Sequence, residues 1–199
     1  MMSARFVYWM NVSLDLFIGR DAEENGGGDW LRISEPLHRE FNRRARALSM
    51  DVSGRVIYEV MEEFWPAART DESLPDYLRE YGEIWVDTPK VLVSRTRVGS
   101  SPDFNTRVIG GDDLLEQLAA LKAESDGDIG VGGANLATQL LKAGLLDELL
   151  LFIHPVILGS GRPLFDGDVG QLDLDLLENT TYDDGVVLHR YAVRGAGVL

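Results

Sequence analysis

Two spacings of apolar residues alternate along the chain and predict alternating strands and helices. Bulky or β-branched runs predict strands near 6–10, 50–53, 90–94, 106–109, 129–131, 149–153, 180–182 and 186–193. Apolar residues three or four positions apart predict helices near 34–48, 55–64, 75–85, 113–121 and 134–142. The unbroken apolar run Leu149–Ile153 is typical of a strand covered on both faces.

Capping and turn residues predict where these elements begin and end. Ser34 is expected to cap the helix that carries Leu37, Phe41, Ala45 and Leu48, and Asp113 with Glu116 predicts a capping box. Trp65-Pro66 is expected to stop a helix, and Gly144 to end another as its C′ residue. Asp183-Asp184-Gly185 predicts a hairpin turn.

Two stretches have no regular pattern. Residues 11–29 contain Gly19 and Gly26-Gly27-Gly28, which indicates a long mobile loop, and such loops are often functional. The acidic stretch Leu172–Leu177 stays unassigned. The remaining elements predict an α/β domain, one domain over 1–199, with a mostly parallel mixed sheet, flanking helices and a C-terminal antiparallel hairpin.

Composition narrows the function classes. The formal net charge of −14 argues against a nucleic-acid or membrane-surface binder, since both need excess Lys and Arg. No apolar run approaches the ~20 residues of a membrane span, and the N-terminus lacks the layout of a signal peptide, so we expect a cytoplasmic protein. Without cysteine, and with His38, His154 and His189 far apart, no metal centre is expected.

A diglycine between a strand and a helix is the first candidate binding motif. Gly132-Gly133 separates Val131 from the predicted helix, whose first N–H groups favour an anion such as a pyrophosphate. The dinucleotide fingerprint G-x-G-x-x-G is not satisfied, because Asn135 stands at its last position. A tight turn and a phosphate cradle both remain open.

Two further strand ends carry cations and hydroxyl groups. Gly54-Arg55 and Ser94-Arg95-Thr96 each follow a predicted strand, and ligands on parallel sheets lie outside the carboxyl ends of the strands. We therefore expect both stretches and Gly132-Gly133 on one rim. Arginine and hydroxyl donors suit a phosphate group, whereas solvated surface charge is the alternative for each arginine.

These stretches together resemble the dihydrofolate reductase superfamily, in the branch of the C-terminal reductase domain of bifunctional riboflavin-biosynthesis deaminase-reductases. The resemblance covers nearly the whole chain. It rests on Ser13-Leu14-Asp15, Gly54–Glu59, Val93–Thr96, Val131-Gly132-Gly133 with Leu136 and Leu140-Leu141, Gly144–Glu148, Pro155–Gly161 and Leu164-Phe165.

The resemblance implies a three-layer dihydrofolate reductase-like fold and an NADPH-dependent reductase, typically a homodimer, similar to 5-amino-6-(5-phosphoribosylamino)uracil reductase. It implies a cis peptide at Gly132-Gly133 beside the cofactor pyrophosphate. The cofactor-binding residues that it implies are Gly54, Arg55, Val56, Ser94, Arg95, Thr96, Val131, Gly132, Gly133, Ala134, Asn135 and Leu136.

Reduction of a C=N or C=O bond consumes a proton, so an acid or a carboxylate that relays one from water should lie near the substrate. The main candidates are Asp15, Tyr58 and Glu59, and further ones are His38 and Glu40. Each has a structural alternative: Asp15 as a loop cap, Tyr58 as a core residue and Glu59 as a surface residue.

Three departures from the family pattern bear on the substrate. Leu16 stands where the family usually has glycine, Ile57 replaces a threonine, and His38 falls at the position of the pterin-binding carboxylate, which argues against dihydrofolate. The substrate's ribose phosphate could meet the basic helix face of Arg39, Arg43 and Arg44, although such faces are usually just solvated. The rival function is a non-catalytic ligand-binding or assembly protein that retains the fold.

Overall fold

The computed structural model describes residues 4–21, 28–100 and 102–195. The chain divides into two compact units: unit 1 is mainly Ile33–Gly130, and unit 2 is Arg5–Arg32 with Val131–Leu199. Across the described residues there are five helices and a mixed, mostly parallel sheet of eight strands. The predicted α/β class with a C-terminal antiparallel hairpin is confirmed.

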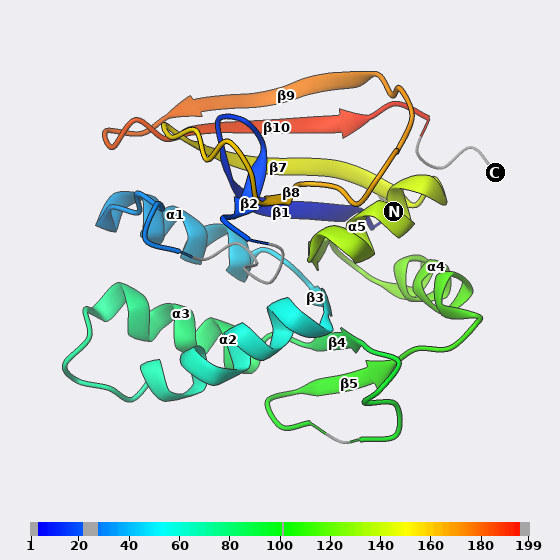
Figure 1. Cartoon of the computed structure of the whole chain (residues 1–199). Helices are drawn as coiled ribbons and strands as arrows, with labels where there is room; N and C mark the ends of the chain where they lie inside the picture. Colours follow the sequence, from blue (N-terminus) through cyan, green and yellow to red (C-terminus); the bar gives the residue numbers. More distant parts are fainter. Residues whose placement is uncertain (1–3, 22–27, 101, 196–199) are drawn as a thin grey trace. The chain divides into compact units, whose positions relative to one another are not determined.

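Unit 1 contains three parallel strands and four helices, which Figure 1 shows from light blue to green. Its strands are β3 (Met50–Gly54), β4 (Lys90–Val93) and β5 (Thr106–Ile109), in the order β5-β4-β3. Its helices are α1 (Glu35–Arg46), α2 (Arg55–Ala68), α3 (Asp76–Asp87) and α4 (Leu114–Glu124). Tyr58, Trp85 and Leu92 form a buried cluster, because the apolar stripes of α2 and α3 meet β4 there.

Unit 2 is built on four strands in the order β1-β7-β10-β9. They are β1 (Phe6–Ser13), β7 (Leu146–His154), β10 (Val187–Val193) and β9 (Leu174–Thr181). β1 and β7 are parallel, whereas β10 runs antiparallel to both β7 and β9. Figure 1 shows the β9–β10 hairpin beside β7.

Three short strands and one helix complete unit 2. β6 (Ile129–Gly132) enters it from unit 1 and leads into α5 (Ala134–Lys142), while β2 (Phe17–Gly19) pairs with β8 (Arg162–Pro163). Gly144 follows α5 with a φ of 67°, so the predicted C′ glycine is confirmed. Residues Leu149–Phe152 of β7 are buried, as predicted for a strand covered on both faces.

The predicted loop at 11–29 was partly wrong. Asn11 to Ser13 extend β1, because they continue its pairing with β7 as far as His154, and Phe17–Gly19 form β2. The glycines Gly26 and Gly27 lie outside the described residues. Leu16 has a φ of 61°, a left-handed conformation that a residue with a Cβ adopts at a cost, which gives a physical reason for glycine at this position in the family.

Helix ends were the least accurate part of the sequence-based prediction. Pro66 lies inside α2, which continues to Ala68 because the ring of Trp65 packs on Tyr81 and Ala68 is buried. The capping box at Asp113 is wrong, since Asp113 makes no capping bond and its Oδ1 accepts from Nε2 of Gln117 at 2.8 Å. Ser34 is the N-cap of α1 but also lacks a side-chain capping bond.

The unassigned acidic stretch forms the start of β9. Its leucines are 39–55% exposed and comprise Leu172, Leu174, Leu176 and Leu177. Within the described residues β9 pairs only with β10, so its other edge carries unpaired backbone groups. Exposed leucines on an edge strand are the pattern of a contact surface.

Candidate functional site

The predicted site residues are divided between the two units, and each set has its own local geometry. In unit 1, Gly54 ends β3 and Arg55 begins α2. Nη1 of Arg55 lies 2.7 Å from Oε2 of Glu59, and both side chains are nearly half exposed. An exposed ion pair of this kind is weak, so a phosphate can replace the carboxylate as the partner of Arg55. Val56 follows and is 41% exposed.

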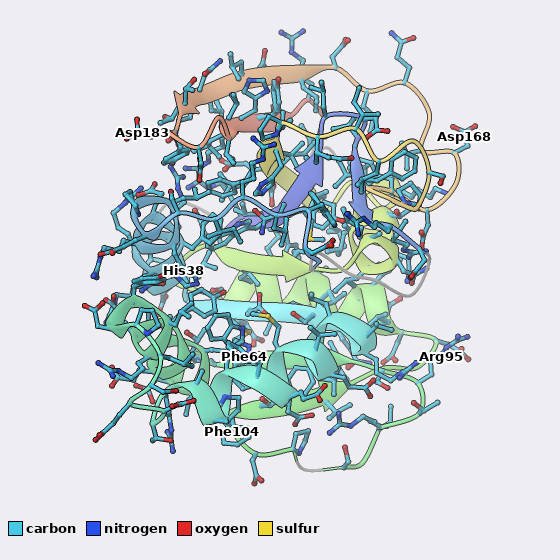
Figure 2. All side chains as sticks on the ribbon, turned by 60° about the vertical axis from the view of Figure 1, so that its left-hand side comes forward. His38, Phe64, Arg95, Phe104, Asp168 and Asp183 are labelled. Carbon is cyan, nitrogen blue, oxygen red and sulfur yellow. The ribbon has the colours of Figure 1, made fainter. Side chains whose placement is uncertain are left out.

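The loop after β4 is held in shape by a buried hydroxyl. Oγ of Ser94, which is buried, accepts hydrogen bonds from the backbone N–H groups of Thr96 at 3.3 Å and Arg97 at 3.1 Å. This turn leaves the side chains of Arg95 and Thr96 exposed. Arg95 forms no hydrogen bond or ion pair with any residue that the structure describes, and Figure 2 shows its side chain pointing outward from the ribbon.

Arg97, two residues further on, is engaged. Its guanidinium lies 5.6 Å from the ring centre of Tyr58 and 3.4 Å from a carboxylate oxygen of Glu62. Of these two arginines, only Arg95 therefore has no carboxylate partner among the residues that the structure describes. Since unpaired guanidinium groups bind phosphate well, the loop presents to an anion one cation and the exposed hydroxyl of Thr96, which lies 3.3 Å from Oγ of Ser94.

The two stretches in unit 1 lie at the same sheet edge. Gly54 pairs in register with Val93, so Arg55 and Ser94 both follow directly from neighbouring parallel strands. This part of the expected rim is confirmed for Gly54-Arg55 and Ser94-Arg95-Thr96. Gly132-Gly133 belongs to unit 2 and lies at the carboxyl end of β6, of which Gly132 is the last residue.

The diglycine in unit 2 forms the start of α5. The peptide bond between Gly132 and Gly133 is trans, so the expected cis peptide is wrong. The turn is made instead by Gly133, whose φ of 100° and ψ of 131° are accessible to glycine but rarely to other residues. Sequence alone cannot decide between these two ways of turning the chain, because glycine permits both.

The N-terminus of α5 has free backbone donors. The first hydrogen bond of the helix runs from the N–H of Ala137 to the carbonyl of Gly133, so the N–H groups of Ala134, Asn135 and Leu136 have no acceptor within the helix. No side chain caps them. Such an end, next to a glycine without a Cβ, fits the pyrophosphate of a dinucleotide.

The side chains around this helix start are already occupied or buried. Nδ2 of Asn135 donates to Asp166 at 3.1 Å, and Oδ1 of Asn135 accepts from Gln139. Asp166 in turn pairs with Arg162. Val131, Ala134 and Leu136 are buried packing residues. Binding at this motif would therefore use the backbone rather than these side chains.

Asp15, the first of the three main proton-transfer candidates, is held by hydrogen bonds from its neighbours. Asp15 accepts from Oγ of Ser13 at 2.6 Å and from the backbone N–H groups of Leu158 and Gly159, and the Ser13 hydroxyl in particular holds the pKa of its carboxyl below the usual value. It therefore stays ionised at neutral pH.

Tyr58 and Glu59 lie on α2 but in different surroundings. Tyr58 is 1% exposed, its hydroxyl lies 3.1 Å from Oγ1 of Thr106, and burial raises its pKa. Glu59 is at the surface, beside Arg55 and 3.9 Å from Arg97. The geometry of Asp15, Tyr58 and Glu59 favours positioning over proton donation.

The further candidates on α1 are also engaged. His38 is 6% exposed among the rings of Phe41, Trp65, Tyr77 and Tyr81, and burial lowers its pKa. Glu40 pairs with Arg43 and Arg44, and the bond from Arg43 is the largest cause of its lowered pKa. Arg39 pairs with Glu35 and Asp76, so carboxylates of unit 1 neutralise the basic face of α1.

A polar pair in unit 2 was missed from the sequence. Nε2 of His154 lies 3.0 Å from Oδ1 of Asn11, and the two residues are neighbours on β7 and β1. Asn11 was placed in a loop and His154 in an apolar strand, so neither was a candidate. The sequence signal that could have identified these residues is a polar side chain within the two-residue periodicity of a strand.

In the described ranges, no group of three or more His, Cys, Asp and Glu side chains is arranged to hold a metal ion. None of the helices described has the length and apolar character needed to cross a membrane.

Comparisons with known proteins agree with the resemblance found in the sequence. A sequence model of the RibD C-terminal domain matches residues 6–188. The uncharacterized protein YyaP of Bacillus subtilis is 30% identical over 184 residues, which cover 92% of each chain.

Solved structures show the fold. A putative riboflavin biosynthesis protein from Shewanella sp. PV-4 is 21% identical and superposes with a TM-score of 0.69 over 97% of this chain and 99% of that one. Dihydrofolate reductase from Enterococcus faecalis, in a complex with NADP(H) and RAB-propyl, is 13% identical, with a TM-score of 0.61 over 97% and 99% of the two chains. The dihydrofolate reductase-like fold predicted from the sequence is confirmed.

Proposed function

Since the chain belongs to the RibD C-terminal domain family, we propose that it is an NADPH-dependent oxidoreductase that reduces a small heterocyclic or carbonyl compound. The observation that carries the proposal is the geometry of the loop after β4. Buried Ser94 holds the backbone of this loop, and Arg95 is exposed and has no carboxylate partner among the described residues. A cation with neighbouring hydroxyl donors suits the 2′-phosphate that distinguishes NADPH from NADH.

The other proposed cofactor contacts follow the same chemistry. Arg55, with Gly54 and Val56 beside it, would exchange its surface partner Glu59 for phosphate, and the N–H groups at the start of α5 would bind the pyrophosphate. When bound, the cofactor supplies the hydride. The related fold of a dihydrofolate reductase that binds NADP(H) supports this assignment of the cofactor.

We assign positioning roles to the three residues first considered for catalysis. Asp15 fixes the backbone of Leu158 and Gly159, Tyr58 supports α2 from the core, and Glu59 orients Arg55. An ionised, hydrogen-bonded Asp15 would hold the segment after β7 in place.

The experiment that tests the proposal is thermal protection by NADPH compared with NADH. A ligand that binds only the native state raises the melting temperature by mass action, so NADPH should protect more strongly than NADH at equal concentration. Arg95→Ala should weaken NADPH about 10- to 100-fold, as expected for one charge-assisted hydrogen-bonding group, and leave NADH nearly unchanged.

Arg69→Ala is a matched control for this experiment. Arg69 is an exposed arginine of unit 1 that directly follows α2, at the end of that helix opposite Arg55, so its loss changes the net charge equally. Equal protection of the unaltered protein by NADPH and NADH would contradict the proposal, as would equal effects of the two substitutions. The rival reading as a non-catalytic binding protein is tested by single-turnover oxidation of bound NADPH with pyrimidine, pterin and quinone acceptors.

We also propose, from the family, that the protein is a cytoplasmic homodimer. The apolar strand Leu149–Ile153 pairs on one edge with β1 and on the other with β10. It therefore has no free edge for a second copy. The exposed leucines of β9 and the residue Leu172 before it are the better candidates within unit 2.

A further inference from the structure

Two consecutive hydrogen bonds in unit 2 determine the orientation of one side-chain amide on β1. The backbone N–H of Arg32 donates to Nδ1 of His154 at 3.0 Å, and Nε2 of His154 lies 3.0 Å from Oδ1 of Asn11. Because a backbone N–H can only donate, Nδ1 is the unprotonated nitrogen, and Nε2 of the neutral ring carries the proton. Oδ1 of Asn11 is the acceptor, which fixes the side of the carboxamide on which the NH₂ group lies.

The neutral state of His154 is enforced by its surroundings. The residue is fully buried, and the ring of Trp30 packs edge-on against it with centroids 5.5 Å apart. Burial is the largest cause that lowers the pKa of His154, to about 4. The charge of Asp184 acts to raise this pKa, and that of Arg32 lowers it further. At neutral pH the direction of both hydrogen bonds is therefore constant.

The NH₂ group of Asn11 remains available. Its Nδ2 atom has no acceptor among the residues that the structure describes, and Asn11 is half-buried, so the group keeps access to solvent. A donor that is already oriented loses little entropy when it binds an acceptor. A partner for buried His154 alone would not require an amide, since a hydroxyl oxygen also accepts a hydrogen bond.

An aromatic ring lies on the same face of the strand. Trp9 precedes Asn11 by two positions, so the two side chains share one face of β1. Trp9 is half-buried and packs against Phe152, the strand partner of Asn11, at 6.0 Å between ring centres. A partly open indole beside a fixed N–H donor is a common way to recognise a flat ring that carries an acceptor.

We propose that Asn11 determines substrate specificity by donating a hydrogen bond to a carbonyl oxygen of a flat heterocycle that lies beside Trp9. His154 is a positioning residue that orients the amide. The inference rests on the proposed reductase function and narrows its substrate to heterocycles with an acceptor at the recognised edge.

The test compares two ring probes on NADPH-saturated protein by ligand-observed NMR. Uracil presents carbonyl acceptors, whereas 2,4-diaminopyrimidine presents amino donors at the same ring positions. The unaltered protein should bind uracil more tightly. Asn11→Asp keeps an acceptor for His154 but replaces the NH₂ donor by an oxygen, so uracil binding should weaken about tenfold and the preference should reverse.

Asn179→Asp is the matched control. Asn179 lies on exposed β9, and its amide is 3.4 Å from Nε2 of His189, so this variant makes the same chemical change beside another histidine. It should leave both probes unaffected. A second variant, Asn11→Ser, keeps a neutral acceptor for His154 and should lose the preference for uracil without reversing it.

The outcomes separate this inference from the proposed function. If Asn11→Asp leaves the preference unchanged, or if neither probe binds the unaltered protein, the role of Asn11 is refuted, while protection by NADPH still supports the reductase. If NADPH gives no protection, the reductase fails, and the probes titrated without cofactor still decide the role of Asn11. Nitrogen NMR that finds the proton of His154 on Nδ1 would also refute the inference.

Discussion

Protonation of His154 should destabilise the protein as the pH falls. In the native state Nδ1 accepts from the backbone of Arg32, so a proton on Nδ1 must break that bond. Burial lowers the pKa to about 4, whereas an unfolded histidine titrates near 6.5. Between these values the unfolded chain binds more protons than the native one, so stability is complete above about pH 6.5 and is lost as the pH falls towards 4.

The size of the effect follows from the two pKa values. The full difference corresponds to about 3 kcal/mol, because each unit is worth about 1.4 kcal/mol. Between pH 7.5 and 5.5 the loss is about 1.3 kcal/mol. The lower limit of pH 5.5 keeps the measurement one unit above the isoelectric point of about 4.5, where an acidic protein of this kind would lose its repulsive charge.

Urea unfolding of the protein and of His154→Gln measures the effect. Other titrating groups contribute equally to both proteins, so the difference between their free energies of unfolding isolates His154. That difference should shrink by about 1.3 kcal/mol from pH 7.5 to 5.5. A direct NMR titration of the three histidine Cε1–H signals, assigned with His38→Gln and His189→Gln, gives the pKa itself.

Two results would refute this reasoning. A difference in stability that does not depend on pH would show that His154 titrates alike in both states. A His154 signal that titrates near 6.5 would show that burial and the bond from the Arg32 backbone do not hold the ring neutral. Either result would also weaken the assigned orientation of the Asn11 amide.

Two further predictions concern single residues of unit 2. Leu16→Gly should raise the free energy of unfolding, measured in urea, by up to about 1 kcal/mol, because Leu16 has a φ of 61°. The control Leu14→Gly, at an exposed position without a positive φ, should not raise it. Leu176→Lys should shift the protein from dimer to monomer in light scattering, and Leu14→Lys should not; an unchanged dimer in both would rule out the exposed face of β9 as the interface.

Local patterns were enough to predict most elements. The spacing of leucines in α5, the apolar run of β7 and the Asp-Gly turn of the hairpin each act within a few residues, so the sequence displays them directly. The parallel direction of β3 and β4 follows from the same information, because strands joined by helices run parallel. The expectation that Gly54-Arg55 and Ser94-Arg95-Thr96 lie at one edge of the sheet rests on this direction.

The tertiary structure decided which side chains are free. Sequence shows Arg55 and Arg95 as equivalent cations, but only Arg95 lacks a carboxylate partner in the described part of the chain. Lys90 was predicted as an ordinary strand residue, yet it is buried and donates to the carbonyls of Trp85 and Thr88, and burial lowers its pKa to about 8.

Asn11 and His154 show the physical reason for this division. They are 143 positions apart, and only the pairing of β1 with β7 brings them together. Periodicity, capping and turn chemistry depend on neighbours along the chain, so the sequence by itself determined the elements and their order. Hydrogen-bond direction, burial and free charge depend on neighbours in space, and these were decided only when the strands paired.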